Sequence, residues 1–471
     1  MKQTRILMLF LLSFVFTASS GQVKRWTLQE CIDYATSNNL QIGQNNLQVR
    51  TAENNLLTSK ANVLPSINGQ SNYTYNTGRR IDPFTNTFAN SRVLSQNYSV
   101  SSNVNLFTGF TNTQTILANQ LSVIAAKYNN EQLKNNIALN VTNAFLQIIL
   151  ADELLIIATN QQNLTKDQSA RGKLLYEAGR TAKGDFLQTE AQLATEELNV
   201  VNARNRLELT YLTIVQLLAL ETTENFEIVK PDFSKTPIEL PAYNVRNVYL
   251  TAVSNQPGIL GADYQVKSAE HTLKAVRGNY YPSLSAFGGL GTGYSELSRK
   301  IIGYDTQSQN IGSINGQPIN IDVQVPITEL TPFSDQVNQN FNRTFGLSLN
   351  VPILNGFATR SRVTQQKIAL DNAKLNSGIA KNQLLLDIQT AYFDAKSAFE
   401  RYRATEKSVL ALQEAFTYIQ QRFDVGMVNA FEYTTSKNQL TSAQSNLAQA
   451  RYEFILRVKV LDFYQGKPIT L

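Results

Sequence analysis

The sequence predicts a mixed fold of α-helices and transmembrane β-strands, built from two tandem copies of one plan. Two halves of the chain align with each other. Each half has two segments of about ten residues with a hydrophobic period of two. Each half then has about 65 residues with a helical period, which is longer than any ordinary globular core requires.

The composition limits the possible classes of function. Of the 471 residues, 42% are hydrophobic and only 17% are charged, and uncharged polar residues are abundant in nearly every segment. The formal net charge is +6, but Lys and Arg are scattered along the chain. Because no basic cluster is present that could follow a row of phosphates, the composition argues against nucleic-acid binding.

Residues 1–21 are typical of a secretory signal peptide. Lys2 and Arg5 precede an apolar run at residues 6–16, which is too short to span a bilayer as a helix. Cys31 is the only cysteine, so the chain cannot form an internal disulfide. No apolar run of about 18 residues follows the signal peptide, and we therefore expect any membrane crossing to use strands.

Internal alignment defines the domain organisation. Residues 61–67 align with residues 278–284, and residues 103–204 align without a gap with residues 350–451. The second copy therefore contains an insertion between these two alignments. We expect a first structural repeat at residues 22–220, a proline-containing linker at residues 221–243 and a second structural repeat at residues 244–471.

Each copy is expected to begin with a helical segment, at residues 27–63 and 245–279. Pro65 and Pro282 end these segments, because proline lacks an N–H group and restricts the residue before it. The pattern then changes to a period of two. The four predicted strands cover residues 66–76, 97–107, 284–294 and 341–351. Their length of about ten residues suffices to cross a bilayer at a tilt.

After Gly109 and Gly356 the helical period continues to Tyr176 and Phe423. At ~1.5 Å per residue this corresponds to roughly 100 Å of helix. Apolar residues recur every three or four positions between small and amide residues, which is typical of helices packed in a coiled-coil-like layer. Turns are expected next, followed by returning helices at residues 185–218 and 431–463.

Four strands cannot close a barrel, and an open edge in lipid leaves backbone groups without hydrogen bonds. Sister copies are therefore expected to complete the barrel. About eight strands fill their interior with side chains, whereas three copies would give twelve strands and an open bore. The Asn- and Ser-rich strand faces would line that bore. The opposite faces would contact lipid through Tyr73, Tyr75, Tyr98 and Phe345.

This order of elements, present twice, resembles the outer-membrane factor (TolC) family over the whole chain after the signal peptide. The segment at residues 26–35, the Leu64-Pro65 and Tyr281-Pro282 breaks and the turn at residues 423–426 are similar to motifs of that family. The resemblance implies a homotrimer in the outer membrane with a twelve-stranded barrel and a helical tunnel in the periplasm. It also implies a periplasmic adaptor and an inner-membrane transporter as partners, in efflux or type I secretion.

The resemblance also implies roles for residues near the two turns. Gly179, Gly426 and Met427 match the tips that contact the adaptor, although both glycines would equally serve a turn between helices. Asp185 and Glu432 match positions that form an acidic ring at the periplasmic entrance. Alternatively, each is a carboxylate in the first turn of a helix.

Three positions depart from the family pattern at the tips. Phe423 and Val428 replace a Tyr and an Arg that hold the tip closed in some relatives, and Thr435 replaces an acidic residue. We therefore expect the closed state to be held by other contacts.

The sequence indicates no catalytic residues, metal ligands or cofactor. His271 has no nearby partner histidine and is expected at the surface of a helix. The glycine-rich segment at residues 288–293 lies in a strand pattern and lacks the helix of a nucleotide-binding loop. The inserted stretch at residues 295–340 is expected to be an extracellular loop.

One alternative function is a trimeric surface fibre or adhesin with a β-barrel anchor. A duplicated strand pair argues against it, because such an anchor needs only one membrane segment per chain. The sequence does not identify the exported substrate.

Overall fold

The computed structural model describes residues 24–82, 84–86, 88–89, 92–222, 226–231, 238–314 and 316–470. The predicted signal peptide lies outside these residues. The chain forms two compact units. The helical unit consists of the residues up to Thr51, Ile124–Gln265 and Lys374–Leu471, and the sheet unit consists of Ala52–Val123 and Val266–Ala373.

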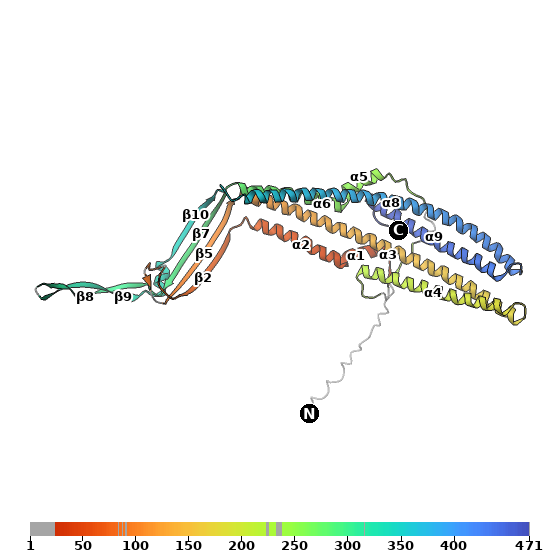
Figure 1. Ribbon diagram of the computed structural model, residues 1–471, viewed down its shortest axis with the longest axis horizontal. Coiled ribbons are helices and arrows are strands. Elements are labelled where there is room, and N and C mark those ends of the chain that lie inside the picture. The colour runs from red at the N-terminus through yellow and green to blue at the C-terminus, as the bar shows by residue number, and fades with distance from the viewer. Residues whose placement is uncertain are drawn as a thin grey trace, which may run out of the picture. The chain divides into compact units, whose positions relative to one another are not determined.

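The elements of the first copy follow the predicted order (Figure 1). They are β1 (Lys24–Trp26), α1 (Leu28–Asn38), α2 (Leu40–Ala61), β2 (Ser66–Asn76), β3 (Arg80–Ile81), β4 (Phe88–Ala89), β5 (Val93–Phe107), α3 (Thr111–Glu177), α4 (Lys183–Leu218) and β6 (Phe226–Ile228).

The second copy repeats this order with a longer strand region. Its elements are α5 (Val245–Asn255), α6 (Pro257–Arg277), the 3-10 turn η2 (Gly278–Tyr280), β7 (Ser283–Ser295), β8 (Arg299–Ile314), β9 (Gln317–Leu330), α7 (Phe333–Gln339), β10 (Asn342–Asn350), α8 (Ala358–Asp424) and α9 (Ala430–Tyr464). The helices α3 and α8 each contain 67 residues, which confirms the two predicted long helices.

The backbone just before each long helix is the same in both copies. Gly109 and Phe110 have φ angles of 61° and 65°, and Gly356 and Phe357 both have 61°. A left-handed phenylalanine is uncommon, so its occurrence at both equivalent positions is independent support for the duplication. Gly109 has a second constraint, because an added Cβ atom would lie 2.3 Å from the carbonyl oxygen of Gly278.

Two local predictions are wrong. The first helical segment of each copy is divided, at Asn39 in one and at Gln256, before Pro257, in the other. The linker contains β6, which pairs in parallel with β1 at the other end of the first copy. Pairing between segments so distant in sequence leaves no local pattern from which β6 could be predicted.

The inserted stretch is a regular β-hairpin, not an irregular loop. β8 and β9 pair from Arg299 with Leu330 to Ile314 with Gln317, and α7 follows. Its glycines are typical of a loop, but they occupy the irregular points of the hairpin: Gly312 lies at a register shift, and Gly316 has a φ of 80° beside the turn. Glycines of this kind are compatible with long paired strands.

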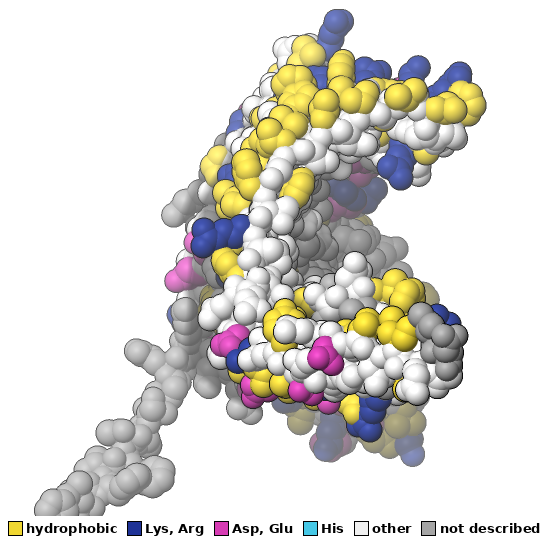
Figure 2. All heavy atoms as spheres, turned by 90° about the vertical axis from the view of Figure 1, so that its left-hand side faces the viewer, with side chains coloured by type: hydrophobic (Ala, Val, Ile, Leu, Met, Phe, Trp, Pro, Cys, Tyr) yellow, Lys and Arg dark blue, Asp and Glu magenta, His cyan; other side chains and the backbone are white. Residues whose placement is uncertain are grey.

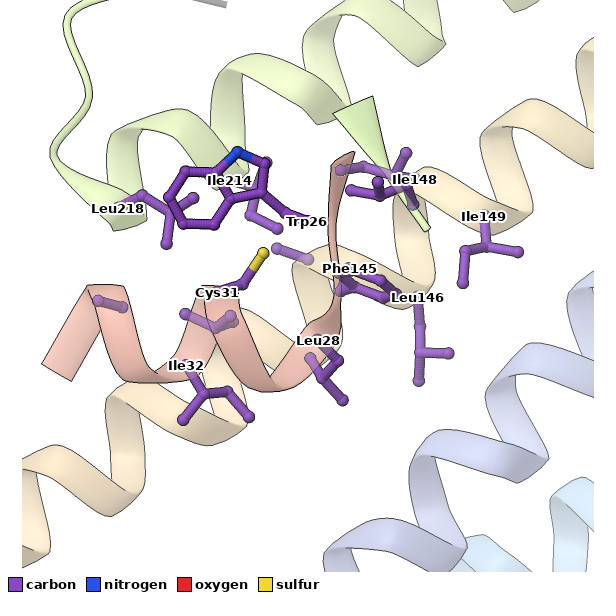
Figure 3. Close-up of a cluster of buried hydrophobic side chains, with 14 of the residues drawn as sticks. Trp26, Leu28, Cys31, Ile32, Phe145, Leu146, Ile148, Ile149, Ile214 and Leu218 are labelled. Atoms are coloured by element: carbon purple, nitrogen blue, oxygen red, sulfur yellow. The ribbon is translucent and has the colours of Figure 1, made fainter. Parts of the chain in front are cut away.

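The main hydrophobic core of the helical unit lies where α1, α3 and α4 meet (Figure 3). Cys31, Phe145 and Ile214 are almost completely buried there, and Trp26 lies beside them. By length and composition α3 could cross a membrane, with an 18-residue window of mean hydropathy 1.7, but 50% of that window is buried inside the protein. We interpret this apolar stretch as part of the core.

The sheet unit contains a four-stranded sheet in the order β10-β7-β5-β2, in which all neighbours are antiparallel (Figure 1). The four predicted strands are therefore confirmed, and β5 begins four residues earlier than expected, at Val93. The glycine-rich segment at residues 288–293 lies within β7, as predicted. Within the described part of the chain, neither β2 nor β10 has a partner on its outer edge.

Candidate functional site

The register of the sheet gives it two chemically different faces. Tyr73 pairs with Gln96, Val100 with Leu290 and Gly288 with Phe345, so these residues lie on one face. The other face carries almost only amide, hydroxyl and glycine residues. Its members are Ser66, Asn68, Gln70, Asn72, Thr74, Asn76, Val93, Ser95, Asn97, Ser99, Ser101, Asn103, Asn105, Ser285, Phe287, Gly289, Gly291, Gly293, Ser295, Asn342, Thr344, Gly346, Ser348 and Asn350. We call these the aromatic face and the polar face.

The four residues predicted to contact lipid all lie on the aromatic face. Tyr73, Tyr75 and Tyr98 are exposed, and Phe345 is 84% exposed. Figure 2 views the molecule from the side of the β8–β9 hairpin and shows hydrophobic side chains (yellow) at the surface among uncharged polar groups (white). Exposed aromatic rings on one side of a sheet and amides on the other are the arrangement of a wall between lipid and water. Contact with lipid stays a prediction.

The two predicted turns at the helix ends have the same hydrogen-bond pattern. Gly179 donates to the carbonyl of Tyr176 at 2.9 Å, and Arg180 donates to Leu175 at 2.8 Å. Gly426 donates to Phe423 at 3.0 Å, and Met427 donates to Arg422 at 2.8 Å.

These are two Schellman motifs, in which a left-handed residue ends a helix. The φ angles of Gly179 and Gly426 are 72° and 81°, and nothing lies within 4 Å of an added Cβ atom at either position. Glycine is therefore required at both positions by the positive φ angle, and not by a lack of space for a side chain. Met427 is 70% exposed at its turn, and its contact with an adaptor stays a prediction.

Asp185 and Glu432 occupy equivalent positions in the first turns of α4 and α9. Asp185 accepts a hydrogen bond from the Thr181 hydroxyl at 3.3 Å, and the backbone N–H of Glu432 donates to the Asn429 side chain at 2.9 Å. Both carboxylates can interact favourably with a helix N-terminus. Both are exposed, so this position is compatible with an acidic ring between copies, which stays a prediction.

An ion pair joins the two helix ends of the chain. A guanidinium nitrogen of Arg171 on α3 lies 2.7 Å from a carboxylate oxygen of Asp424 on α8, and another donates to the Asp424 carbonyl at 3.3 Å. Phe423 stacks on Tyr433 with ring centroids 4.5 Å apart. Burial, and then the charge of Asp424, raises the pKa of Tyr433. Sequence reasoning missed this pair, because its members lie far apart in the chain.

A buried polar cluster lies farther along the same helices. Lys437 and Glu196 are 1% and 4% exposed, and Lys437 donates to the hydroxyl of Thr165 at 2.6 Å. Glu196 accepts from Gln192 at 2.7 Å and from Asn199 at 3.0 Å. Burial lowers the pKa of Lys437, and the nearby Glu196 carboxylate opposes that shift. No pattern in the sequence indicates that these charges are buried.

His271 is partly buried in the sheet unit, so its predicted place on the open surface of a helix is wrong. Its Nδ1 atom lies 2.7 Å from the side-chain oxygen of Gln114 on α3. We therefore interpret His271 as a packing residue that forms a hydrogen bond between two helices.

Comparisons with known proteins agree with this geometry. The family model described as outer membrane efflux protein matches residues 31–220 and 248–466. The outer membrane efflux protein BepC of Brucella suis is 23% identical over 435 residues, which cover 91% of this chain and 83% of BepC. The outer membrane protein TolC of Vibrio cholerae is 21% identical over 325 residues, which cover 69% of this chain and 66% of TolC.

The fold is also similar to solved structures. The crystal structure of the outer membrane protein VceC from Vibrio cholerae superposes with a TM-score of 0.72 at 12% identity, over 94% of this chain and 96% of VceC. Family and fold together do not favour the surface-fibre alternative. The chain therefore belongs to the outer membrane efflux protein family, a family of channels, and is a protein of the cell outer membrane.

Proposed function

We propose that three copies of this chain share one twelve-stranded β-barrel, and that the long helices continue its bore as a passive exit duct. The observation that carries this proposal is the four-stranded sheet with a polar face, an aromatic face and two edges that no other described strand of the chain pairs with. Free edges in lipid leave N–H and C=O groups without partners, at a cost of several kcal/mol each. Another copy is the simplest source of the missing strands.

The strand directions support closure by identical copies. β2 leads from α2 away from the helices, and β10 leads back toward α8. A β10 edge of one copy would therefore meet a β2 edge of the next in antiparallel orientation, as at every other pairing in the sheet. The same interface would then repeat around the ring.

The register supports a tilted barrel. Asn342, at the start of β10, pairs with Gly291 of β7, which pairs with Ser99 of β5, which pairs with Gln70 of β2. The start of β10 is thus level with the interior of β2 and not with its end at Asn76. A progressive offset of this kind is required when strands tilt around a barrel.

The number of copies follows from the need for an open channel inside the barrel. Two copies would give eight strands, whose interior is nearly filled by side chains, whereas twelve strands leave an aqueous channel. The polar face would line that channel with neutral amides and hydroxyls. Such a lining favours passage of varied solutes over recognition of one, so we infer a conduit and not an enzyme, without a resident cofactor or metal.

The helix ends would serve as the periplasmic entrance. The turns at Gly179 and Gly426 would dock onto a periplasmic adaptor, and an inner-membrane transporter would supply the substrate and the energy. Similarity to export channels supports this assignment.

Disulfide cross-linking tests the shared barrel. In a Cys31→Ser background, one cysteine replaces Asn72 on β2 and a second replaces Thr344 or Ser348 on β10, all on the polar face. Within one chain β5 and β7 separate these positions, by roughly 14 Å, which is too far for a disulfide. Oxidation should therefore join different copies into a ladder that ends at the trimer.

The corresponding single-cysteine chains are the controls and should not form this ladder. Single-channel conductance of the uncrosslinked oligomer should show a stable water-filled pore. A ladder ending at the dimer, or a water-soluble monomer without conductance, would contradict the proposal.

A further inference from the structure

The four strands of the sheet contain one charged residue, Arg343, the second residue of β10. Arg343 pairs with Leu290, which places it on the aromatic face with Phe345. A charge on the lipid side of a barrel is strongly unfavourable at the centre of a bilayer and nearly neutral at its interface. The position of Arg343 near the start of its strand therefore suits the interface of a bilayer and not its centre.

A second arginine reaches the same face. Arg92 directly precedes β5, and its guanidinium carbon lies 3.8 Å from the centroid of the Tyr75 ring. Tyr75 lies on the aromatic face. Similarly, the guanidinium of Arg343 lies 5.2 Å from the centroid of the Phe341 ring. A ring beneath the guanidinium holds its position but leaves the N–H donors at its edge free for another acceptor.

Both arginines lie at strand ends that are not joined to the long helices α3 and α8. β5 begins next to Arg92 and ends at Phe107, just before α3. β10 begins next to Arg343 and ends at Asn350, before α8. A third pair, Arg79 over Phe88 at 5.5 Å, follows the outer end of β2. The outer end of the sheet therefore combines aromatic rings with arginines.

The carboxylates near this end do not neutralise the two arginines. Among the described residues, no carboxylate forms an ion pair with Arg92 or Arg343. Glu296 accepts the backbone N–H of Leu94 at 3.3 Å, and Asp335 lies 4.0 Å from Lys300. The side chains of Arg92 and Arg343 are both exposed.

We propose that Arg92 and Arg343 bind the phosphate groups of lipid headgroups in the outer leaflet of the outer membrane. The inference rests on the proposed function, which directs the helices into the periplasm and this end of the sheet outward. A guanidinium can donate two parallel hydrogen bonds to one phosphate. The adjacent aromatic rings would lie at the level of the headgroups, where such rings concentrate in membrane barrels. Charge complementarity selects an anionic lipid as the occupant.

Native mass spectrometry of the purified oligomer tests this binding. The probes are bisphosphorylated lipid A and the same lipid after removal of both phosphates. The wild-type oligomer should bind the phosphorylated form at least about tenfold more tightly, since each arginine near an anionic surface contributes about fivefold. Equal binding of the two lipids by the wild type would overturn the proposal without any variant.

Variants locate the site. Replacing both residues, Arg92→Gln with Arg343→Gln, should weaken binding of phosphorylated lipid A by about twentyfold and leave the dephosphorylated form unaffected. The double lysine variant keeps the charges but loses the paired N–H donors, so its affinity should lie between those of the wild type and the double glutamine variant. Arg403→Gln is the matched control, because Arg403 also lies over a ring, Phe399 at 5.9 Å, but on the helix α8. A double glutamine variant that binds like the wild type would overturn the proposal.

Two further measurements separate the lipid site from a site for free phosphate and from the duct itself. Millimolar inorganic phosphate should not displace the lipid, and full displacement would show a site for free phosphate instead. Conductance of the same samples tests the proposed function separately. A conducting oligomer that does not distinguish the two lipids refutes only the lipid site, whereas absence of a pore refutes the duct.

Discussion

The ammonium group of Lys437 donates a hydrogen bond to the hydroxyl of Thr165 at 2.6 Å, and both side chains are buried. This contact joins α9 of the second copy to α3 of the first. Nearby, Gln161 donates to Asn438 at 3.1 Å and accepts from the hydroxyl of Thr441 at 2.8 Å. The two copies of the repeat are thus connected by polar contacts inside the helical unit, where an apolar contact would be usual.

The pH dependence of stability should reflect Lys437. Burial lowers its pKa from the ordinary value of 10.5, so between the folded and unfolded pKa values the unfolded chain binds a proton that the folded chain does not. Stability should therefore rise with pH through that window. Lys437→Met should flatten the rise, measured as the midpoint of thermal unfolding while the pH is increased toward the ordinary lysine pKa of 10.5.

Lys407→Met, at an exposed position on α8, is the matched control and should keep the wild-type slope. Removing the other buried charge is a second test. Glu196→Gln should destabilise the protein by ~1 kcal/mol or more, because the buried Lys437 ammonium loses the nearby negative charge and Gln192 and Asn199 lose an ionised acceptor. A Lys437→Met protein with an unchanged slope would contradict this account.

The ion pair between Arg171 and Asp424 should contribute to keeping the helix ends together. Both side chains are about half exposed, at 54% and 52%, so the pair is expected to contribute no more than ~1 kcal/mol. Asp424→Asn should therefore raise the open probability of the pore at most about fivefold, and high salt should have a similar effect on the wild type. Single-channel recording at two salt concentrations measures both. A larger, salt-independent effect would point to a structural role for Asp424.

The acidic residues near the entrance should set ion selectivity if they form a ring. Asp185→Asn together with Glu432→Gln should reduce cation preference and block by multivalent cations, because rings of carboxylates attract cations. Reversal potentials in a salt gradient measure the preference. Glu208→Gln, exposed farther along α4, is the control. Unchanged selectivity in the double variant would remove the ring and leave only the first-turn role.

Two glycines should respond oppositely to alanine. Gly426 has a φ of 81° at the end of α8, so Gly426→Ala should destabilise the turn by ~1 kcal/mol or more. Gly378 lies inside α8 with nothing within 4 Å of an added Cβ atom, and Gly378→Ala should stabilise the helix by ~0.5–1 kcal/mol. Thermal unfolding of both variants provides the comparison. Equal shifts of the same sign would show that backbone conformation does not decide the effect.

The local elements and the duplication could be predicted from the amino-acid sequence alone. The change from a period of two to a helical period at Gly109 and Gly356 predicted the strands, the long helices and their ends within a few residues. Alternation along each strand also predicted its two faces. These features could be predicted because the hydrophobic period depends only on the geometry of the local backbone.

Contacts between residues that are distant in sequence became visible only in the folded protein. It determined the strand order β10-β7-β5-β2, the pairing of β6 with β1, and the burial of Lys437 beside Thr165. It also brought Arg171 to Asp424 and placed Arg343 on the aromatic face. Each of these contacts depends on chain segments that are distant in sequence, so no local period encodes them and only the packed structure specifies them.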